Sequence, residues 1–369
     1  MDPSPVPSPA AAAVPQPGPE PEPTISMIPI GTGTQSVTHS LWTSISGPAQ
    51  DLNQDRNQAP LSTSRKSPLI VVIAGAGDVA SSYVALERLL RPFARVFLYD
   101  RTGLGRSQSV PERYRPSAVI AAEELHTVLT NVDVNVTVPK GSESQSDADH
   151  GFQKYILVAH SYGGIIAREF LHLYPSTVAG LVLVDCATER SSELLTFPDP
   201  NIVAVMGDLN FARVTGLRQD TVLSDEEWRV RARDIRAGAE MAGAEAKSFV
   251  EVCETLRAKE QVRNQALGDR PLVVIRANGV RDYERIYEAG VKSGHGSPEQ
   301  QRAFRNLLDR WEGIDREVQE GQLGLSRGNK LVRNEDCGHN VHIVRPDVVV
   351  QGVRWVLDML SLGDGEGER

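Results

Sequence analysis

A short stretch of the chain, Ala159 to Gly164 with the sequence Ala-His-Ser-Tyr-Gly-Gly, constrains its fold more than any other. It lies between the apolar run Tyr155 to Val158 and a helical pattern. A sharp turn from strand to helix can hold a serine hydroxyl at its tip only if the residues two positions to either side are small. Ala159 and Gly163 satisfy this requirement. The stretch therefore predicts a strand, a turn with Ser161 at its tip, and a helix.

Apolar runs of strand length alternate with helical patterns along the rest of the chain. Continuous apolar runs, typical of strands buried on both faces, occur at Leu69 to Ile73, Val96 to Tyr99, Tyr155 to Val158, Leu181 to Val184 and Leu272 to Ile275. We expect Ile25 to Ile30 and Val37 to Ile45 to pair antiparallel at a sheet edge, and Lys330 to Arg333 to form a last short strand. The pattern predicts an α/β fold with a doubly wound, mostly parallel sheet.

Helical patterns are densest between two of these strands. From residue 189 to residue 261 the strand signal is absent, and the capping box Ser224 to Glu227 predicts the start of one helix. We interpret this block as a helical cap over the pocket of a single domain, residues 25–362. Beyond these, we expect a disordered tail at residues 1–24, which hold nine prolines, a surface insertion at 131–151 and a disordered end at 363–369.

Composition and charge argue against several classes of partner. Lys and Arg number 39 against 48 Asp and Glu, a net charge of -9, so we expect no basic face that could neutralise nucleic-acid phosphates. The chain shows no signal-peptide pattern and no apolar run long enough to span a membrane, and its three cysteines are too few for a disulfide framework. We therefore expect a cytoplasmic protein without membrane insertion, and the oligomeric state is left open.

Cys337, His339 and His342 are potential metal ligands that lie close together in the sequence. Their spacing, Cys-x-His-x-x-His, lacks a fourth ligand and matches no common zinc pattern. We therefore expect no metal and no cofactor.

Several motifs together resemble those of the α/β-hydrolase fold enzymes, over roughly Ile25 to Leu362. In the chain order of that family, the first motif is Ala74 to Ala76, at the end of the strand that leads to the oxyanion donor. The others are Asp100 to Ser107 in the loop after the next strand, Ala159 to Gly164 at the turn, and Gly338-His339 before the last helix. The strand that leads to the oxyanion donor ends in Ala74-Gly75, where the family often has His-Gly. This difference leaves the backbone N–H donor intact. The resemblance implies this fold, a helical cap and catalysis without a cofactor.

The resemblance also implies a role for each candidate site residue. Ser161 is the implied nucleophile, and His339 the general base that takes the hydroxyl proton. His342 is the competing histidine, and we expect it to pack rather than react. The backbone N–H groups of Ala76 and Tyr162 are expected to form the oxyanion hole, which stabilises the charge of a tetrahedral intermediate.

Two aspartates compete for the role of the acid that orients His339. Asp185 directly follows a buried strand, and the carboxyl ends of parallel strands are where α/β proteins hold functional groups. Asp282 lies in the loop where most relatives carry the acid, but it is also placed to cap a helix. We place Asp185 ahead and keep Asp282 as the alternative acid.

These features favour a serine hydrolase that cleaves an ester, thioester or lactone bond of a small organic substrate. A lyase, cyclase or acyltransferase on the same fold is the alternative, because the same pocket can exclude water or move protons without net hydrolysis. A non-catalytic ligand-binding protein is a third hypothesis, which an intact set of Ser161, His339 and a strand-end aspartate argues against.

Overall fold

The computed structural model describes residues 22–32, 37–48, 67–111, 113–137 and 153–366. Most of the expected tail, residues 1–21, lies outside these ranges. Of the expected insertion, residues 138–151 also lie outside them. The expected disordered end is described as far as residue 366.

A single sheet of eight strands forms the centre of the described chain. The strands are β1 (Thr24–Thr32), β2 (Val37–Ser46), β3 (Leu69–Ile73), β4 (Val96–Tyr99), β5 (Tyr155–His160), β6 (Val178–Val184), β7 (Leu272–Ala277) and β8 (Asn329–Asn334). Their order across the sheet is β1-β2-β4-β3-β5-β6-β7-β8. β1 and β2 form an antiparallel pair, β2 pairs antiparallel with β4, and all other neighbours are parallel. The mostly parallel sheet predicted from the apolar runs is confirmed.

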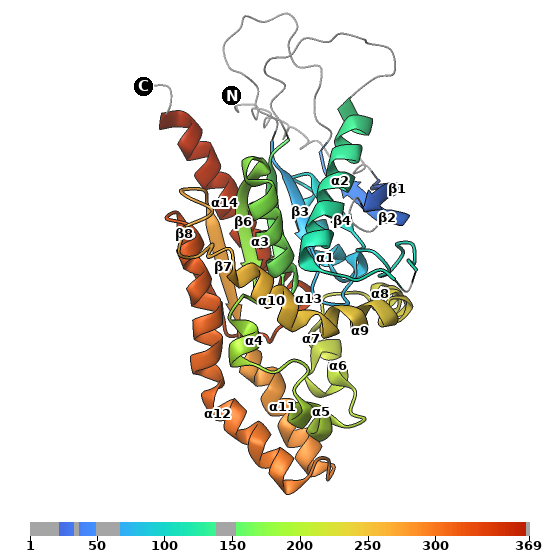
Figure 1. Ribbon diagram of the computed structural model, residues 1–369, viewed down its shortest axis with the longest axis vertical. Coiled ribbons are helices and arrows are strands. Elements are labelled where there is room, and N and C mark those ends of the chain that lie inside the picture. The colour runs from blue at the N-terminus through green and yellow to red at the C-terminus, as the bar shows by residue number, and fades with distance from the viewer. Residues whose placement is uncertain (1–21, 33–36, 49–66, 112, 138–152, 367–369) are drawn as a thin grey trace, which may run out of the picture.

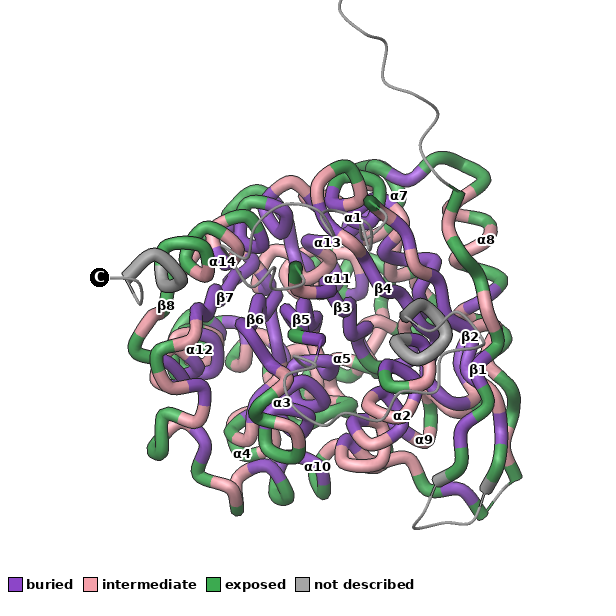
Figure 2. Tube along the Cα trace, turned by 90° about the horizontal axis from the view of Figure 1, so that it is seen from above, coloured by how far each residue is buried: buried purple, intermediate pink, exposed green. Residues whose placement is uncertain are grey.

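Helices cover both faces of the sheet and also extend beyond its strand ends. They are α1 (Val84–Leu90), α2 (Ala118–Thr137), α3 (Gly163–Leu173), α4 (Ser191–Leu194), α5 (Pro200–Met206), α6 (Phe211–Val214), α7 (Leu217–Asp220), α8 (Asp225–Ala237), α9 (Ala239–Lys247), α10 (Phe249–Arg257), α11 (Gly279–Lys292), α12 (Pro298–Gly321), α13 (Val341–Val344) and α14 (Pro346–Glu366). Figure 2 shows the buried strands between α1 and α14 on one side and α2 and α3 on the other. The strands β3 to β7 are buried along their whole length, which is why their sequences are apolar except for His160 in β5 and Arg276 in β7.

Two helices extend further than their sequences predict. Helix α2 continues to Thr137, so the first residues of the expected insertion at 131–151 are helical. Helix α14 continues to Glu366, so residues 363–366 of the expected disordered end are helical as well. Each residue added to an existing helix gains one hydrogen bond, whereas starting a new helix fixes several residues for a single bond. Polar or glycine-containing ends can therefore remain helical.

The helical region beyond the strand ends is larger than residues 189–261. Helices α4 to α10 lie within that range, and the capping box predicted at Ser224 begins α8. However, α11 and α12 pack against α5 (Figure 1) around a small separate core of Val205, Ile286, Phe304 and Leu308. This helical region therefore includes segments that precede β7 and segments that follow it in the sequence.

No helix in the described part of the chain is long and apolar enough to cross a membrane.

Candidate active site

Strand pairing brings Ser161 and Asp185 to the same edge of the sheet. His160, the last residue of β5, pairs with Val184, the last residue of β6. The Ser161 N–H donates to the Val184 carbonyl at 3.1 Å, and the Asp185 N–H donates to the Ile275 carbonyl of β7 at 2.8 Å. The two candidate residues thus begin the loops that follow two adjacent parallel strands.

The turn at Ser161 has the geometry that its small neighbours predict. Ser161 has a φ of 54°, in the left-handed region that residues with a side chain rarely adopt. A Cβ atom on Gly163 would lie 2.3 Å from the Ile73 carbonyl oxygen, and one on Gly164 would lie 2.4 Å from the Cys186 Cβ. Glycine is therefore required at both positions, because α3 starts in direct contact with the strand ends.

His339 faces Asp185 across this edge. The Nδ1 atom of His339 lies 2.6 Å from the Asp185 Oδ2 atom, and the other Asp185 oxygen accepts the Ala277 N–H at 3.1 Å. Asp185 is 7% exposed and, like Ser161, has a positive φ, of 47°. Because a carboxylate only accepts, Nδ1 carries the proton and Nε2 is left as the basic nitrogen of His339.

Asp282 touches the main chain of His339 rather than its ring. Its Oδ2 atom accepts the His339 N–H at 3.1 Å, and a Cβ atom on Gly338 would lie 2.0 Å from that oxygen. The expectation that Asp282 caps a helix is wrong, because α11 begins earlier and its N-cap is Asn278, whose side chain accepts the Arg281 N–H. Burial raises the pKa of Asp282, although the His339 N–H opposes this effect.

The pKa of His339 reflects its two acidic neighbours. Burial alone would lower it, but the hydrogen bond to Asp185 and the charges of Asp185 and Asp282 outweigh burial and raise it above the ordinary histidine value. The ring is 38% exposed, so solvent reaches the side chain. His339 is thus a stronger base than a free histidine.

The serine hydroxyl and the two expected oxyanion donors are available for a ligand. Among the described residues, the Ser161 hydroxyl and the N–H groups of Ala76 and Tyr162 have no hydrogen-bond partner. The loop that carries Ala76 lies against the turn, since a Cβ atom on Gly75 would be 3.2 Å from the Ser161 Cβ. Hydrogen bonds of a catalytic serine often form or shorten only when substrate binds.

Comparison with known proteins agrees with the fold. The family model described as "Alpha/beta hydrolase family" matches residues 70–352. The chain belongs to the alpha/beta hydrolase family.

Relatives of this alpha/beta hydrolase share a modest part of its sequence. An AB hydrolase superfamily protein of Gibberella zeae is 26% identical over 315 residues, which are 82% of this chain and 90% of that protein. A probable transporter of Hormonema carpetanum, efuK, is 25% identical over 87% of this chain, but the match spans 42% of its own length. A solved structure of a thermophilic esterase from Thermogutta terrifontis, at 16% identity, matches with a TM-score of 0.51 over 91% of this chain and 99% of the esterase. At this identity the likeness shows the fold.

A buried histidine, His160, joins several parts of the hydrolase site. Its Nε2 atom lies 3.0 Å from the His339 carbonyl oxygen, and its Nδ1 atom lies 3.1 Å from the Tyr83 hydroxyl, which also accepts the Gly75 N–H at 3.2 Å. A carbonyl only accepts, so Nε2 donates and Nδ1 accepts the Tyr83 proton. Burial lowers the pKa of His160 well below its usual value, and the neighbouring histidines add to the effect. Neutral His160 therefore links the Gly75 loop to the main chain of His339.

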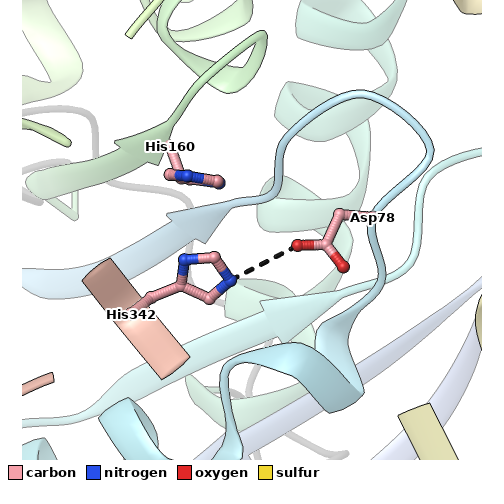
Figure 3. A group of neighbouring side chains, drawn as sticks. All are labelled: Asp78, His160 and His342. Atoms are coloured by element: carbon pink, nitrogen blue, oxygen red, sulfur yellow. Dashed lines mark ion pairs between the residues drawn. The ribbon is translucent and has the colours of Figure 1, made fainter. Parts of the chain in front are cut away.

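His342 packs in the same network, and its ring and charge contacts among the described residues are with Tyr83, His160 and Asp78. Its ring stacks on Tyr83 at a centroid distance of 4.2 Å, and its Nε2 atom lies 3.4 Å from the Asp78 Oδ2 atom. Figure 3 shows His342 directed at Asp78 with His160 beside them. Burial lowers the pKa of His342, although Asp78 opposes this effect. The geometry agrees with a packing role.

A metal ion does not fit the residues that could hold one. In the described part of the hydrolase, Asp78, His160 and His342 are the group whose potential ligand atoms come close together. Both nitrogens of His160 already have hydrogen-bond partners, so neither is open to an ion. The Cys337, His339 and His342 set does not converge, because Cys337 accepts from Asn334 and His339 faces Asp185.

We expect Tyr83→Phe to destabilise the hydrolase. The change leaves the buried Gly75 N–H and the His160 Nδ1 without a partner, which costs about 1–3 kcal/mol of unfolding free energy. Tyr99→Phe is the matched control, because the Tyr99 hydroxyl is buried and has no partner among the described residues. Urea unfolding of both variants measures the difference. Equal stability of the two variants would show that the Tyr83 bonds contribute little.

A cavity of about 440 Å³ lies between residues 188–190, the end of α10 with the segment that follows it, and the end of α12, but Ser161 and His339 do not line it. Its wall is charged: Arg190 pairs with Glu317, Arg257 with Glu193, and Arg263 with Glu260. We therefore do not assign it to the reacting part of a substrate.

Sequence reasoning missed four residues of the candidate site: His160, Tyr83, and the buried pair Arg101 and Glu245, whose side chains bind the backbone on both sides of Ala76. His160 and Arg101 follow or end strands, so the rule that functional groups gather at strand ends could have indicated both. Glu245 lies within α9 and Tyr83 directly precedes α1, and neither belongs to a motif of its own. Their roles depend on three-dimensional packing that no local pattern encodes.

Proposed function

We propose that this protein is a serine hydrolase that cleaves an ester, thioester or lactone bond of a small organic molecule through Ser161, His339 and Asp185. One observation carries the proposal. The Asp185 carboxylate binds Nδ1 of His339 at 2.6 Å, on the strand end beside the Ser161 turn. A carboxylate, an imidazole and a serine held on one edge of a sheet are the parts that nucleophilic acyl transfer needs.

Each proposed residue has a defined task in the reaction. Nε2 of His339 takes the Ser161 proton as the hydroxyl oxygen bonds to the substrate carbonyl carbon, and Asp185 stabilises the imidazolium that forms. The N–H groups of Ala76 and Tyr162 bind the oxyanion. His339 then returns the proton to the leaving alcohol or thiol, and water attacks the acyl-enzyme by the same route.

The comparisons support this class of chemistry at the level of the family. An esterase shares the fold, and the family model covers the segment that contains all three proposed residues. The acyl group and the leaving group of the substrate are open, so the proposal names the bond and not the compound.

A fluorophosphonate probe tests the proposal. The Ser161 oxygen should displace fluoride from phosphorus, and mass spectrometry of the labelled protein should place the adduct on Ser161. A panel of aryl esters, thioesters and lactones then measures hydrolysis. Absence of labelling would contradict an activated serine, whereas labelling without hydrolysis of any panel member would favour a lyase, cyclase or acyltransferase.

We expect kcat/KM to rise with pH through the pKa of His339. Only neutral imidazole accepts the Ser161 proton, so activity is lost as pH falls below that pKa. Because Asp185 raises the pKa of His339, the midpoint of the rise in kcat/KM should lie above the ordinary histidine value of about 6.5. The measurement is kcat/KM for an uncharged ester from acidic to mildly alkaline pH. A midpoint well below that value would contradict the role of Asp185.

A further inference from the structure

The loop that carries the Ala76 N–H is held by a buried arginine. Arg101 follows β4, and its guanidinium donates to the carbonyls of Ala74 and Gly75, both at 2.7 Å. The central carbon of the guanidinium, Cζ of Arg101, also lies 5.8 Å from the centre of the Tyr162 ring. One side chain thus contacts both segments that supply the proposed oxyanion donors.

The cap supplies the counter-charge of this arginine. Glu245, in cap helix α9, accepts from the Arg101 Nε at 2.8 Å and Nη2 at 2.9 Å, and its Oε2 atom accepts the Gly77 N–H at 2.7 Å. Both side chains are buried, 4% and 5% exposed. Burial alone would lower the pKa of Arg101, but Glu245 raises it above its usual value, so the guanidinium stays charged.

Helix α9 also meets the same loop by packing. Gly77 has a φ of 61°, and a Cβ atom there would lie 2.6 Å from the Cβ of Ala242 in α9. One residue before Gly77 is Ala76, whose N–H must point at the oxyanion. The backbone on both sides of Ala76 is therefore fixed by the cap, directly at Gly77 and through Arg101 at Ala74 and Gly75.

We propose that Glu245 is a positioning residue for the oxyanion hole, through which cap helix α9 sets the place of the Ala76 N–H. The proposal rests on the proposed function, since it concerns the transition state of the same reaction. Displacing a donor by a fraction of an ångström weakens binding of the oxyanion but leaves the ground-state substrate almost unaffected. Glu245 acts through the loop and does not touch the substrate.

The test compares Glu245→Gln with Glu240→Gln, an exposed glutamate of the same helix, and measures turnover and boronate binding. In phenylboronic acid the Ser161 oxygen adds to boron and its proton passes to His339, which gives a tetrahedral adduct that resembles the intermediate. We expect Glu245→Gln to lower kcat by about 10- to 100-fold, less than the 100- to 1,000-fold effect of removing a donor, with KM within about twofold. Boronate affinity should fall by the same factor as kcat, and Glu240→Gln should change neither.

If Glu245→Gln does not fold, a second variant, Arg101→Lys, tests the same positioning role. It keeps the charge but removes the fork that reaches both carbonyls, and the same parallel loss of kcat and boronate affinity is expected. Unchanged kcat, or a lower kcat with unchanged boronate affinity, would overturn the positioning role. A wild-type protein that neither binds the boronate nor hydrolyses any ester would overturn the proposed function, and the positioning role with it.

Discussion

Ser161→Ala is expected to abolish turnover, with a loss in kcat of up to about a millionfold. The variant removes the oxygen that is proposed to bond to the substrate carbonyl, and Ser161 is the serine at the tip of the turn after β5. Removing the nucleophile of a complete triad costs about as much as removing all of its members, because they act as a unit. The remaining activity would come from the oxyanion hole and from binding alone.

The serine variant is assayed beside Ser176→Ala, which makes the same chemical change at an exposed position. Both proteins should unfold at close to the wild-type temperature, and only Ser161→Ala should lose kcat and fluorophosphonate labelling. A Ser161→Ala protein that keeps a tenth of the wild-type kcat would rule out nucleophilic catalysis at this position.

Asp185→Asn is expected to lower kcat by about ten thousandfold at neutral pH. The amide can donate a hydrogen bond to Nδ1 of His339, which would place the proton on Nε2 and leave that nitrogen unable to accept from Ser161. The amide also lacks the charge that stabilises the imidazolium. The pKa of His339 should fall as well, because the hydrogen bond and charge of Asp185 are the largest effects that raise it.

Asp282→Asn is the matched control, since it makes the same change on the other carboxylate that contacts His339. An amide oxygen can still accept the His339 N–H, so kcat should change little and the unfolding free energy should fall by about 1 kcal/mol or less. Steady-state kinetics and urea unfolding of both variants, measured side by side, separate the two roles. Near-normal kcat for Asp185→Asn, with loss for Asp282→Asn, would assign the acid to Asp282.

Much of the fold follows from the sequence because it depends on local patterns. Strands buried on both faces must be continuously apolar, so β3 to β7 were visible as runs such as Leu69 to Ile73. Glycine at residues 163 and 164 indicated the close approach of helix and strand. The ends of α2 and α14 were less predictable, because propagation of an existing helix overrides the weak preference of the residues at its end.

The candidate site was only partly predictable for a different reason. Ser161 and His339 each lie in a motif, but the choice between Asp185 and Asp282 depends on which carboxylate faces the ring and which faces the main chain of His339. Those orientations follow from the position of α11, which starts at Gly279 and turns Asp282 toward the His339 N–H. A spacing in sequence cannot distinguish the two contacts.

The left-handed backbone at Ser161 and Asp185 has a consequence for engineering this hydrolase. In the described chain, two of the four non-glycine residues with positive φ are these two site residues. Each such residue costs about 1–3 kcal/mol, which the surrounding structure must offset. Selection for heat resistance alone would therefore favour glycine at Ser161, which removes the proposed nucleophile while relieving the strained backbone; at Asp185 the bonds to His339 and to the Ala277 N–H offset the strain. A search for thermostable variants must score turnover at every round, because at this site the most stable sequence and the active sequence differ.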